Sequence, residues 1–445
     1  MRKISLQKWN WLKKEVHILR EEGVLESDVA ERLVRYYAER TSTGLPWMMT
    51  IFSILGALLI GGGIILLFAH NWDELSRPVR TVLSLTPLMI AAIVSFFAVR
   101  KNENIALRES AGIFHALAIG AAIALIGQTY HIPSNVPSFF LTWLLLLLPL
   151  PFLLRSTGSI LFYLVLLVTW TGISQEQNGQ ALAFWGLILP PVYWTVQKIR
   201  TQKYSPETLL SLWGLLLAIT CSLGIVLEKT VPGLWIVIYS AFLSGIALLG
   251  MWLYREQDGW NNPLQTLGIV GISLLTYLFT WSEMWEDVGW NYIRNGWRFA
   301  HWGCWTDTFL LLLVFAFWIF CVWTVIRKNI GGSLLLIVHP LITALCFVTL
   351  ASVISGEMIT MFVFNLLLLA MGISYILQGC RHTKLRQLNG GMGLLTLLIV
   401  TRFFDSDIEY FARGAIFIVL GISFIGSNIY IVHRKKQLLT KGETA

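Results

Sequence analysis

The sequence predicts an all-α protein: a polytopic helical bundle in a membrane, with about fourteen transmembrane helices and a short cytoplasmic helical hairpin at the N-terminus. Two observations lead to this fold class. Of the 445 residues, 56% are hydrophobic and only 13% are charged, whereas a soluble domain usually carries about 25% charged residues. The apolar residues also gather in runs of about 20, the length that crosses the hydrocarbon of a bilayer. A soluble enzyme, a secreted disulfide scaffold and a disordered chain are therefore excluded.

Helices rather than a water-soluble core follow because every backbone polar group in lipid must be paired within the protein. The five cysteines are odd in number and show no CxxC spacing, so no disulfide framework, metal site or cofactor is predicted. Many charges precede the first apolar run. We therefore expect no cleavable signal peptide, and we expect that run to act as an uncleaved insertion signal.

Residues 1–46 are polar, and their pattern is helical. Leu12, Val16 and Leu19 recur at helical spacing, Gly23 is a stop signal, and a second helix can start at Ser27. Two such helices are too small to bury a core of their own. We expect an amphipathic hairpin that lies on the membrane or on the cytoplasmic face of the bundle, or that docks another envelope protein. The acidic second helix argues against a DNA-binding helix-turn-helix, so no nucleic acid is expected.

The transmembrane region is predicted over residues 47–433 and is followed by a basic cytoplasmic tail, 434–445. We predict spans at 47–70, 79–99, 110–128, 136–154, 157–174, 180–197, 208–227, 233–254, 263–281, 307–326, 333–354, 358–378, 388–404 and 412–433. With both termini in the cytoplasm, 26 of the 33 basic residues fall on the inner side and 7 on the outer side. This split satisfies the positive-inside rule, which a missed span would violate.

Two polar clusters follow the first and third spans, and on this topology both lie on the outer face. Small residues at intervals of four, Gly112, Ala116 and Gly120 in the third span and a similar set in the first, can bring these spans together. The sequence therefore predicts one outer polar pocket, or alternatively ordinary helix caps and an aromatic belt. Its candidate residues are Asn71, Trp72, Asp73, Gln128, Tyr130 and His131.

A tryptophan-rich segment separates the ninth and tenth predicted spans. Tryptophan prefers the headgroup layer of a bilayer, so a flat interfacial helix is the simplest expectation. The alternative is an aromatic platform for a sugar or a lipid headgroup, with arginines that contact phosphate. The platform would consist of Trp285, Trp290, Arg294, Trp297 and Arg298.

Several motifs occur in an order that resembles a known bacterial family. They are Gly23-Val-Leu-Glu-Ser, then Gly56-Ala-Leu-Leu-Ile-Gly-Gly-Gly-Ile through Phe68-Ala-His-Asn-Trp-Asp, then Ile126-Gly-Gln-Thr-Tyr-His. Over residues 5–135 the chain resembles the family known as domain of unknown function 2157. Arg402-Phe-Phe-Asp is similar to an element in the C-terminal parts of such proteins. The resemblance implies a multi-pass inner-membrane protein and no established activity.

No charged residue falls near the middle of a predicted span, where ion-coupled transporters and pumps usually keep one. The polar candidates at that depth are His115, His339 and Asn365. The first hypothesis is a non-enzymatic permease or flippase-like protein for an envelope lipid or a small neutral solute. The alternatives are a structural or assembly partner of another envelope protein and a membrane-embedded transferase that uses a lipid-linked donor. Membrane lipids are expected partners in each case.

Overall fold

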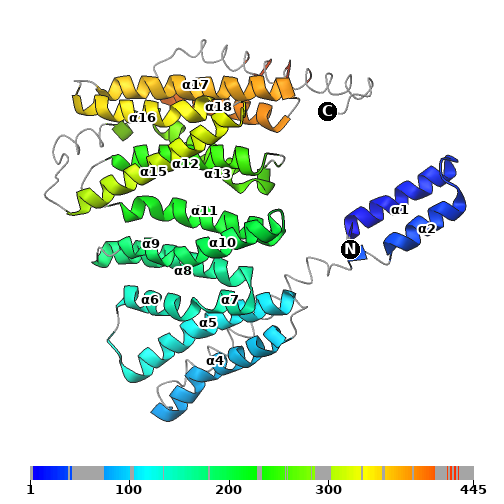
Figure 1. Ribbon diagram of the computed structural model, residues 1–445, viewed down its shortest axis with the longest axis vertical. Coiled ribbons are helices and arrows are strands. Elements are labelled where there is room, and N and C mark those ends of the chain that lie inside the picture. Colours follow the sequence, from blue (N-terminus) through cyan, green and yellow to red (C-terminus); the bar gives the residue numbers. More distant parts are fainter. Residues whose placement is uncertain are drawn as a thin grey trace. The chain divides into compact units, whose positions relative to one another are not determined.

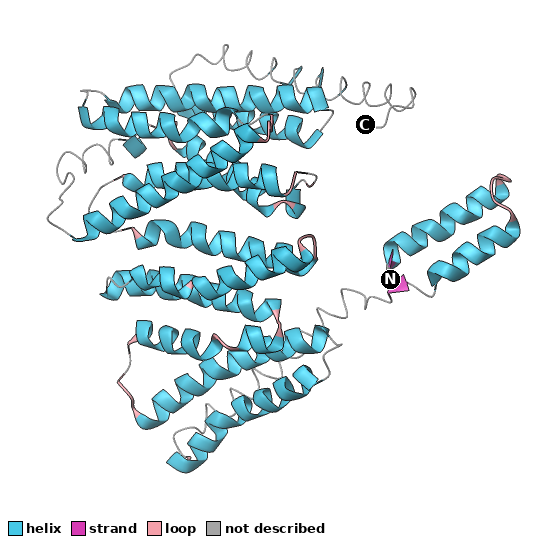
Figure 2. Cartoon of the chain, viewed as in Figure 1, coloured by secondary structure: helices cyan, strands magenta, loops and turns pink. Residues whose placement is uncertain are grey.

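The computed structural model describes residues 4–38, 41–42, 75–100, 105–133, 135–178, 181–227, 233–255, 257, 259–281, 283–285, 302–331, 334–352, 356–382 and 385–405, with isolated positions between 418 and 429. The chain divides into two compact units, Met1–Leu83 and Ser84–Ala445. The described residues are almost entirely helical (Figure 2). Exceptions are the two-residue strands β1 (Ile4–Ser5) and β2 (Thr41–Ser42), which pair in parallel.

In the first unit, helices α1 (Leu6–Glu21) and α2 (Ser27–Ala38) pack against each other. The turn between them contains Gly23 at φ 71°, a left-handed conformation that glycine adopts without steric cost. The Val24 N–H donates to the Leu19 carbonyl at 2.9 Å, which completes a glycine C-cap. The helix stop predicted at Gly23 and the start at Ser27 are therefore confirmed.

Helix α4 (Arg77–Arg100) crosses the boundary between the units. Figure 1 shows the following helices of the larger unit packed in successive layers. They are α5 (Ile105–Tyr130), α6 (Val136–Leu147), α7 (Leu150–Leu154), α8 (Thr157–Asn178), α9 (Phe184–Leu187), α10 (Leu189–Gln202), α11 (Pro206–Val226), α12 (Leu234–Leu253), α13 (Pro263–Leu278), α15 (Trp302–Arg327), α16 (Leu334–Ser352), α17 (Gly356–His382) and α18 (Leu385–Asp405). Two short 3₁₀ segments, Ala181–Ala183 and Gly259–Asn261, precede α9 and α13.

Eight helical segments of the described chain are long and apolar enough to cross a membrane. They coincide with the predicted spans two to five, seven, eight, ten and twelve. Predicted spans nine and eleven correspond to the shorter apolar helices Pro263–Leu278 and Leu334–Leu350. The first and most of the last predicted spans fall outside the described residues, so the total of fourteen stays a prediction.

The core of the larger unit has two main parts. One is built by α4 to α11 around residues such as Tyr163 and Leu167, and the other by α11 to α17. Helix α12 is the most deeply buried of the candidate spans. It packs against α13, α15 and α16. Neighbours on several sides explain its nearly continuous apolar sequence.

The small residues of α5 pack against the helices that follow it. A side chain at Gly112 would collide with Ser156 and Ser159, and one at Gly120 would collide with the ring of Trp143. The Trp143 indole N–H donates to the Ala116 carbonyl at 2.8 Å. The partner expected from the sequence, span one, lies outside the described residues. In the structure α6 and α8 pack against this stripe.

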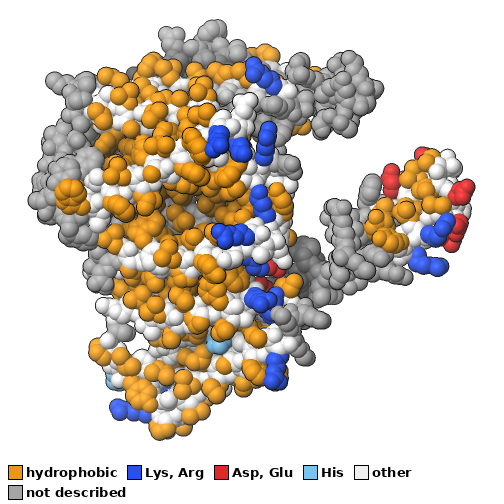
Figure 3. Space-filling view, in the orientation of Figure 1, with side chains coloured by type: hydrophobic (Ala, Val, Ile, Leu, Met, Phe, Trp, Pro, Cys, Tyr) orange, Lys and Arg blue, Asp and Glu red, His pale blue; other side chains and the backbone are white. Residues whose placement is uncertain are grey.

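Basic side chains gather mainly along one edge of the larger unit (right in Figure 3), whereas apolar side chains predominate on the rest of the visible face that is not drawn in grey. Arg100 is the last residue of α4 and Arg327 the last of α15. Segments that the predicted topology assigns to the cytoplasm also contact one another. The Glu109 carboxylate, for example, accepts hydrogen bonds from the backbone N–H groups of Thr157 (2.9 Å) and Gly158 (2.7 Å) at the start of α8.

Candidate functional site

The predicted outer pocket is only partly visible. Asn71, Trp72 and Asp73 fall outside the described residues, while Gln128, Tyr130 and His131 lie at the C-terminal end of α5 and are exposed. His131 has the left-handed φ of 52°, and the Ile132 N–H donates to the Gly127 carbonyl at 3.0 Å. These are the features of a Schellman cap. His131 therefore ends the helix, and the shared pocket remains a prediction.

Of the predicted tryptophan platform, Trp285 lies within the described residues. Trp285 is fully buried, and its indole N–H donates to the Phe279 carbonyl at 2.8 Å, at the end of α13. Its ring lies 4.7 Å from that of Phe279 and 5.2 Å from that of Phe364. Trp285 is thus packed in the core, and its buried indole N–H is paired, as is usual for a buried tryptophan. Trp290, Arg294, Trp297 and Arg298 lie outside the described residues.

The clearest polar site in the larger unit surrounds His339. Its Nδ1 lies 2.7 Å from the Ser240 hydroxyl of α12, and its Nε2 lies 2.9 Å from the Thr276 hydroxyl of α13. The Thr343 hydroxyl, one turn further along α16, is 3.1 Å from that of Ser240. All four side chains are buried. A paired network of this kind fixes one arrangement of helices, because separating it would leave polar groups unpaired in an apolar core.

The residue after His339 explains another contact. Pro340 has no N–H, so the Leu336 carbonyl one turn earlier loses its helical partner. The Ser244 hydroxyl of α12 donates to this carbonyl instead. The network therefore joins α12, α13 and α16, and it compensates for a proline within a membrane helix, as membrane proteins require.

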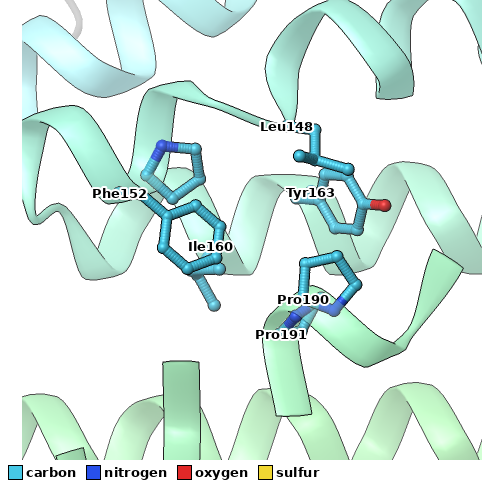
Figure 4. A pocket seen from close by; sticks show the side chains of 7 residues that line it. Leu148, Phe152, Ile160, Tyr163, Pro190 and Pro191 are labelled. Carbon is cyan, nitrogen blue, oxygen red and sulfur yellow. The ribbon is translucent and has the colours of Figure 1, made fainter. Parts of the chain in front are cut away.

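A second proline site repeats this arrangement. Pro191 interrupts the path from α9 to α10 and frees the Leu187 carbonyl, to which the Tyr163 hydroxyl of α8 donates at 2.9 Å. Figure 4 shows Tyr163 beside Pro190 and Pro191, with Leu148, Phe152 and Ile160 around them. Pro151 completes this narrow apolar space, where the break between α6 and α7 meets the break between α9 and α10. The space has no room for a water molecule, so it is a packing contact.

The N-terminal hairpin carries a groove of about 350 Å³ between its two helices. Val16 and Ala30 are buried and Val34 is partly buried, and together they form an apolar floor. The exposed lining residues are Lys13, His17, Arg20, Glu31 and Arg35. Ordinary ligand pockets begin at about 300 Å³, so the groove is large enough to receive a side chain or a helix face.

Only part of this groove was foreseen. The sequence pattern placed Val16 on the apolar face of the first helix, but it did not identify the basic residues beside it. Lys13, Arg20 and Arg35 could have been found by plotting both helices together, because Lys13 and Arg20 are seven residues apart and share a face with Val16. The groove itself depends on how the two helices pack.

Several long apolar helices, a buried polar network around His339 and one basic edge together define a multi-pass helical membrane protein. Residues 17–160 match the family model described as "Predicted membrane protein (DUF2157)". The match begins within α1 and continues to the first residues of α8, so the resemblance noted in the sequence is confirmed. No curated protein and no solved structure matches the chain.

Proposed function

We propose that the protein is an assembly partner in the inner membrane, with both termini cytoplasmic, whose N-terminal hairpin docks an acidic amphipathic helix of another envelope protein. The membrane bundle anchors the hairpin. The groove between α1 and α2 carries this proposal, because it combines an apolar floor with a basic rim.

The chemistry of the groove determines the proposed occupant. Val16, Ala30 and Val34 offer an apolar surface for the side chains that recur every three or four residues on one helix face. Lys13, Arg20 and Arg35 outnumber the single acid of the lining, Glu31. A partner helix with Asp and Glu beside its apolar face therefore complements both the floor and the rim.

The first test measures binding of a synthetic acidic amphipathic peptide to the full-length protein in nanodiscs of zwitterionic lipid. We expect binding that weakens with salt and that falls several-fold in the Arg20→Gln and Arg35→Gln variants. Arg32→Gln is the matched control. Arg32 lies on α2, as Arg35 does, but outside the groove, and it pairs with Asp28 at 2.6 Å.

The proposal fails if the acidic peptide binds no better than a copy with lysines in place of its acids, or if Arg35→Gln and Arg32→Gln behave alike. Vesicles containing phosphatidylglycerol test the other occupant. If Arg20→Gln and Arg35→Gln lower vesicle binding while the peptide does not bind, the hairpin is a membrane-surface element instead.

A permease or flippase-like role for an envelope lipid or neutral solute is the second proposal. One observation favours it: the helix breaks before α7 and before α10 face each other across the space beside Tyr163. Transporters commonly use interrupted helices. Scrambling of a fluorescent lipid in proteoliposomes at a rate above that of protein-free vesicles would support this role, and an unchanged rate would argue against it.

A further inference from the structure

Helices α4 and α15 end in the same way, with an arginine above an exposed aromatic ring. The Arg100 guanidinium carbon lies 4.9 Å from the ring centre of Phe96, and that of Arg327 lies 5.1 Å from the ring centre of Trp323. Phe96 and Trp323 are 55% and 54% exposed. In both pairs the arginine follows the aromatic residue by four positions, so the stacking is local and both groups face outward.

A third pair shows a different environment. Lys198 lies 5.5 Å from the ring centre of Trp194, but Trp194 is buried and Lys198 forms a salt bridge with Glu207 at 2.6 Å. Within the part of the chain that the structure describes, Arg100 and Arg327 form no salt bridge. Lys198 therefore receives its counter-ion from the protein, whereas the two exposed arginines can take one from outside.

The surface that leads to each arginine is apolar. On α4, Ile93 and Met89 are exposed one and two turns before Phe96. On α15, Leu313 and Phe320 occupy the corresponding stripe before Trp323. Acyl chains that lie along these stripes would place a lipid phosphate near the guanidinium group at the helix end.

We propose that Arg100 and Arg327 each bind the phosphate of an anionic phospholipid whose acyl chains lie along α4 or α15. A guanidinium can donate two parallel hydrogen bonds to a phosphate. The exposed ring beneath it supports the headgroup, and a lipid with a net negative charge supplies a counter-ion. A zwitterionic lipid offers the same phosphate together with a repelling cation.

The experiment uses full-length protein in nanodiscs that contain phosphatidylglycerol and phosphatidylcholine, and native mass spectrometry counts the lipids that remain bound. We expect retention of phosphatidylglycerol over phosphatidylcholine. Each of Arg100→Gln and Arg327→Gln should lower that preference by about fivefold, the size expected for one basic residue near an anionic surface. Lys198→Gln is the matched control and should leave the preference unchanged.

Two results would overturn the proposal. One is wild-type protein that retains both lipids equally, and the other is an Arg100→Gln, Arg327→Gln double variant with the wild-type preference. The Arg100→Lys, Arg327→Lys variant keeps both charges and should keep part of the preference. If it loses as much as the glutamine variant, the arginines act through packing and the headgroup role is wrong.

Discussion

Single residues decide how closely the membrane helices approach. At Gly120 the missing side chain leaves room for the Trp143 ring, and the adjacent Ala116 carbonyl accepts the indole hydrogen bond at 2.8 Å. His131 and Asn329 take left-handed conformations at φ 52° and 49° to end their helices. A left-handed conformation at a residue other than glycine is uncommon, so the residue type alone predicts it only weakly.

We expect Gly120→Leu to destabilise the protein by about 1–3 kcal/mol, because the added side chain cannot fit without repacking. The measurement is thermal unfolding in detergent. Ala124→Leu, one turn further along α5 at an exposed position, is the matched control and should have little effect. Equal stabilities of the two variants would contradict the account of the α5–α6 contact.

At the scale of helices, hydroxyl groups replace the backbone hydrogen bonds that prolines remove. The Tyr163 hydroxyl donates to the Leu187 carbonyl, which Pro191 leaves without a helical partner. The Ser244 hydroxyl donates to the Leu336 carbonyl, which Pro340 leaves without one. Hydrogen bonds between membrane helices average about 0.6 kcal/mol. We expect these two hydroxyl–carbonyl hydrogen bonds to contribute more to stability, because each carbonyl otherwise has no partner.

A double-mutant cycle tests this dependence. Tyr163→Phe should destabilise the protein by about 1–2 kcal/mol while Pro191 is present. In a Pro191→Ala background the new N–H can bond to the Leu187 carbonyl, so the same change should cost clearly less. Ser244→Ala and Pro340→Ala form the parallel cycle. If the two changes are additive in both cycles, the hydroxyls do not compensate for the prolines.

The positions of helices could be predicted from the sequence to a much greater degree than their contacts. An apolar run is a local property of consecutive residues, so the runs in the sequence locate α4, α5 and α12. A contact between distant residues leaves no local pattern. Trp285 has the sequence context of an interfacial residue, yet it is buried, because Phe279 and Phe364 surround it only once α13 and α17 pack.

The predicted outer pocket also depends on contacts between distant residues, which leave no local pattern in the sequence. Polarity at the ends of spans one and three suggested a shared site, but nothing local says which neighbour each end meets. The groove of the hairpin and the His339 network likewise require residues from separate helices. Their individual residues were visible in the sequence, and their combination was not.

For the whole molecule, the basic edge sets the expected orientation. Lysine and arginine side chains gather on one side of the larger unit (Figure 3), and such residues favour the cytoplasm. Orientation also determines which proposals can hold, because the hairpin must face cytoplasmic partners and the two arginines must face the inner leaflet.

Cysteines introduced at Asn178 and Asn102, in a background without the native cysteines, test this orientation. An impermeant thiol reagent applied from outside should label position 178 and fail to label position 102. Permeabilised cells provide the control, since both positions should then react. The opposite pattern would reverse the topology and move the outer polar residues to the cytoplasm.

The proline contacts also bear on how the chain assembles during synthesis. Tyr163 precedes Leu187, and Ser244 precedes Leu336 by 92 residues. Each donor therefore leaves the ribosome before the carbonyl that needs it. We therefore expect the hydroxyl to be in the membrane before the proline-containing helix arrives, so that it can pair with the freed carbonyl as that helix enters the bilayer. The order of residues along the chain thus places each donor helix in the membrane before the helix whose carbonyl it pairs with.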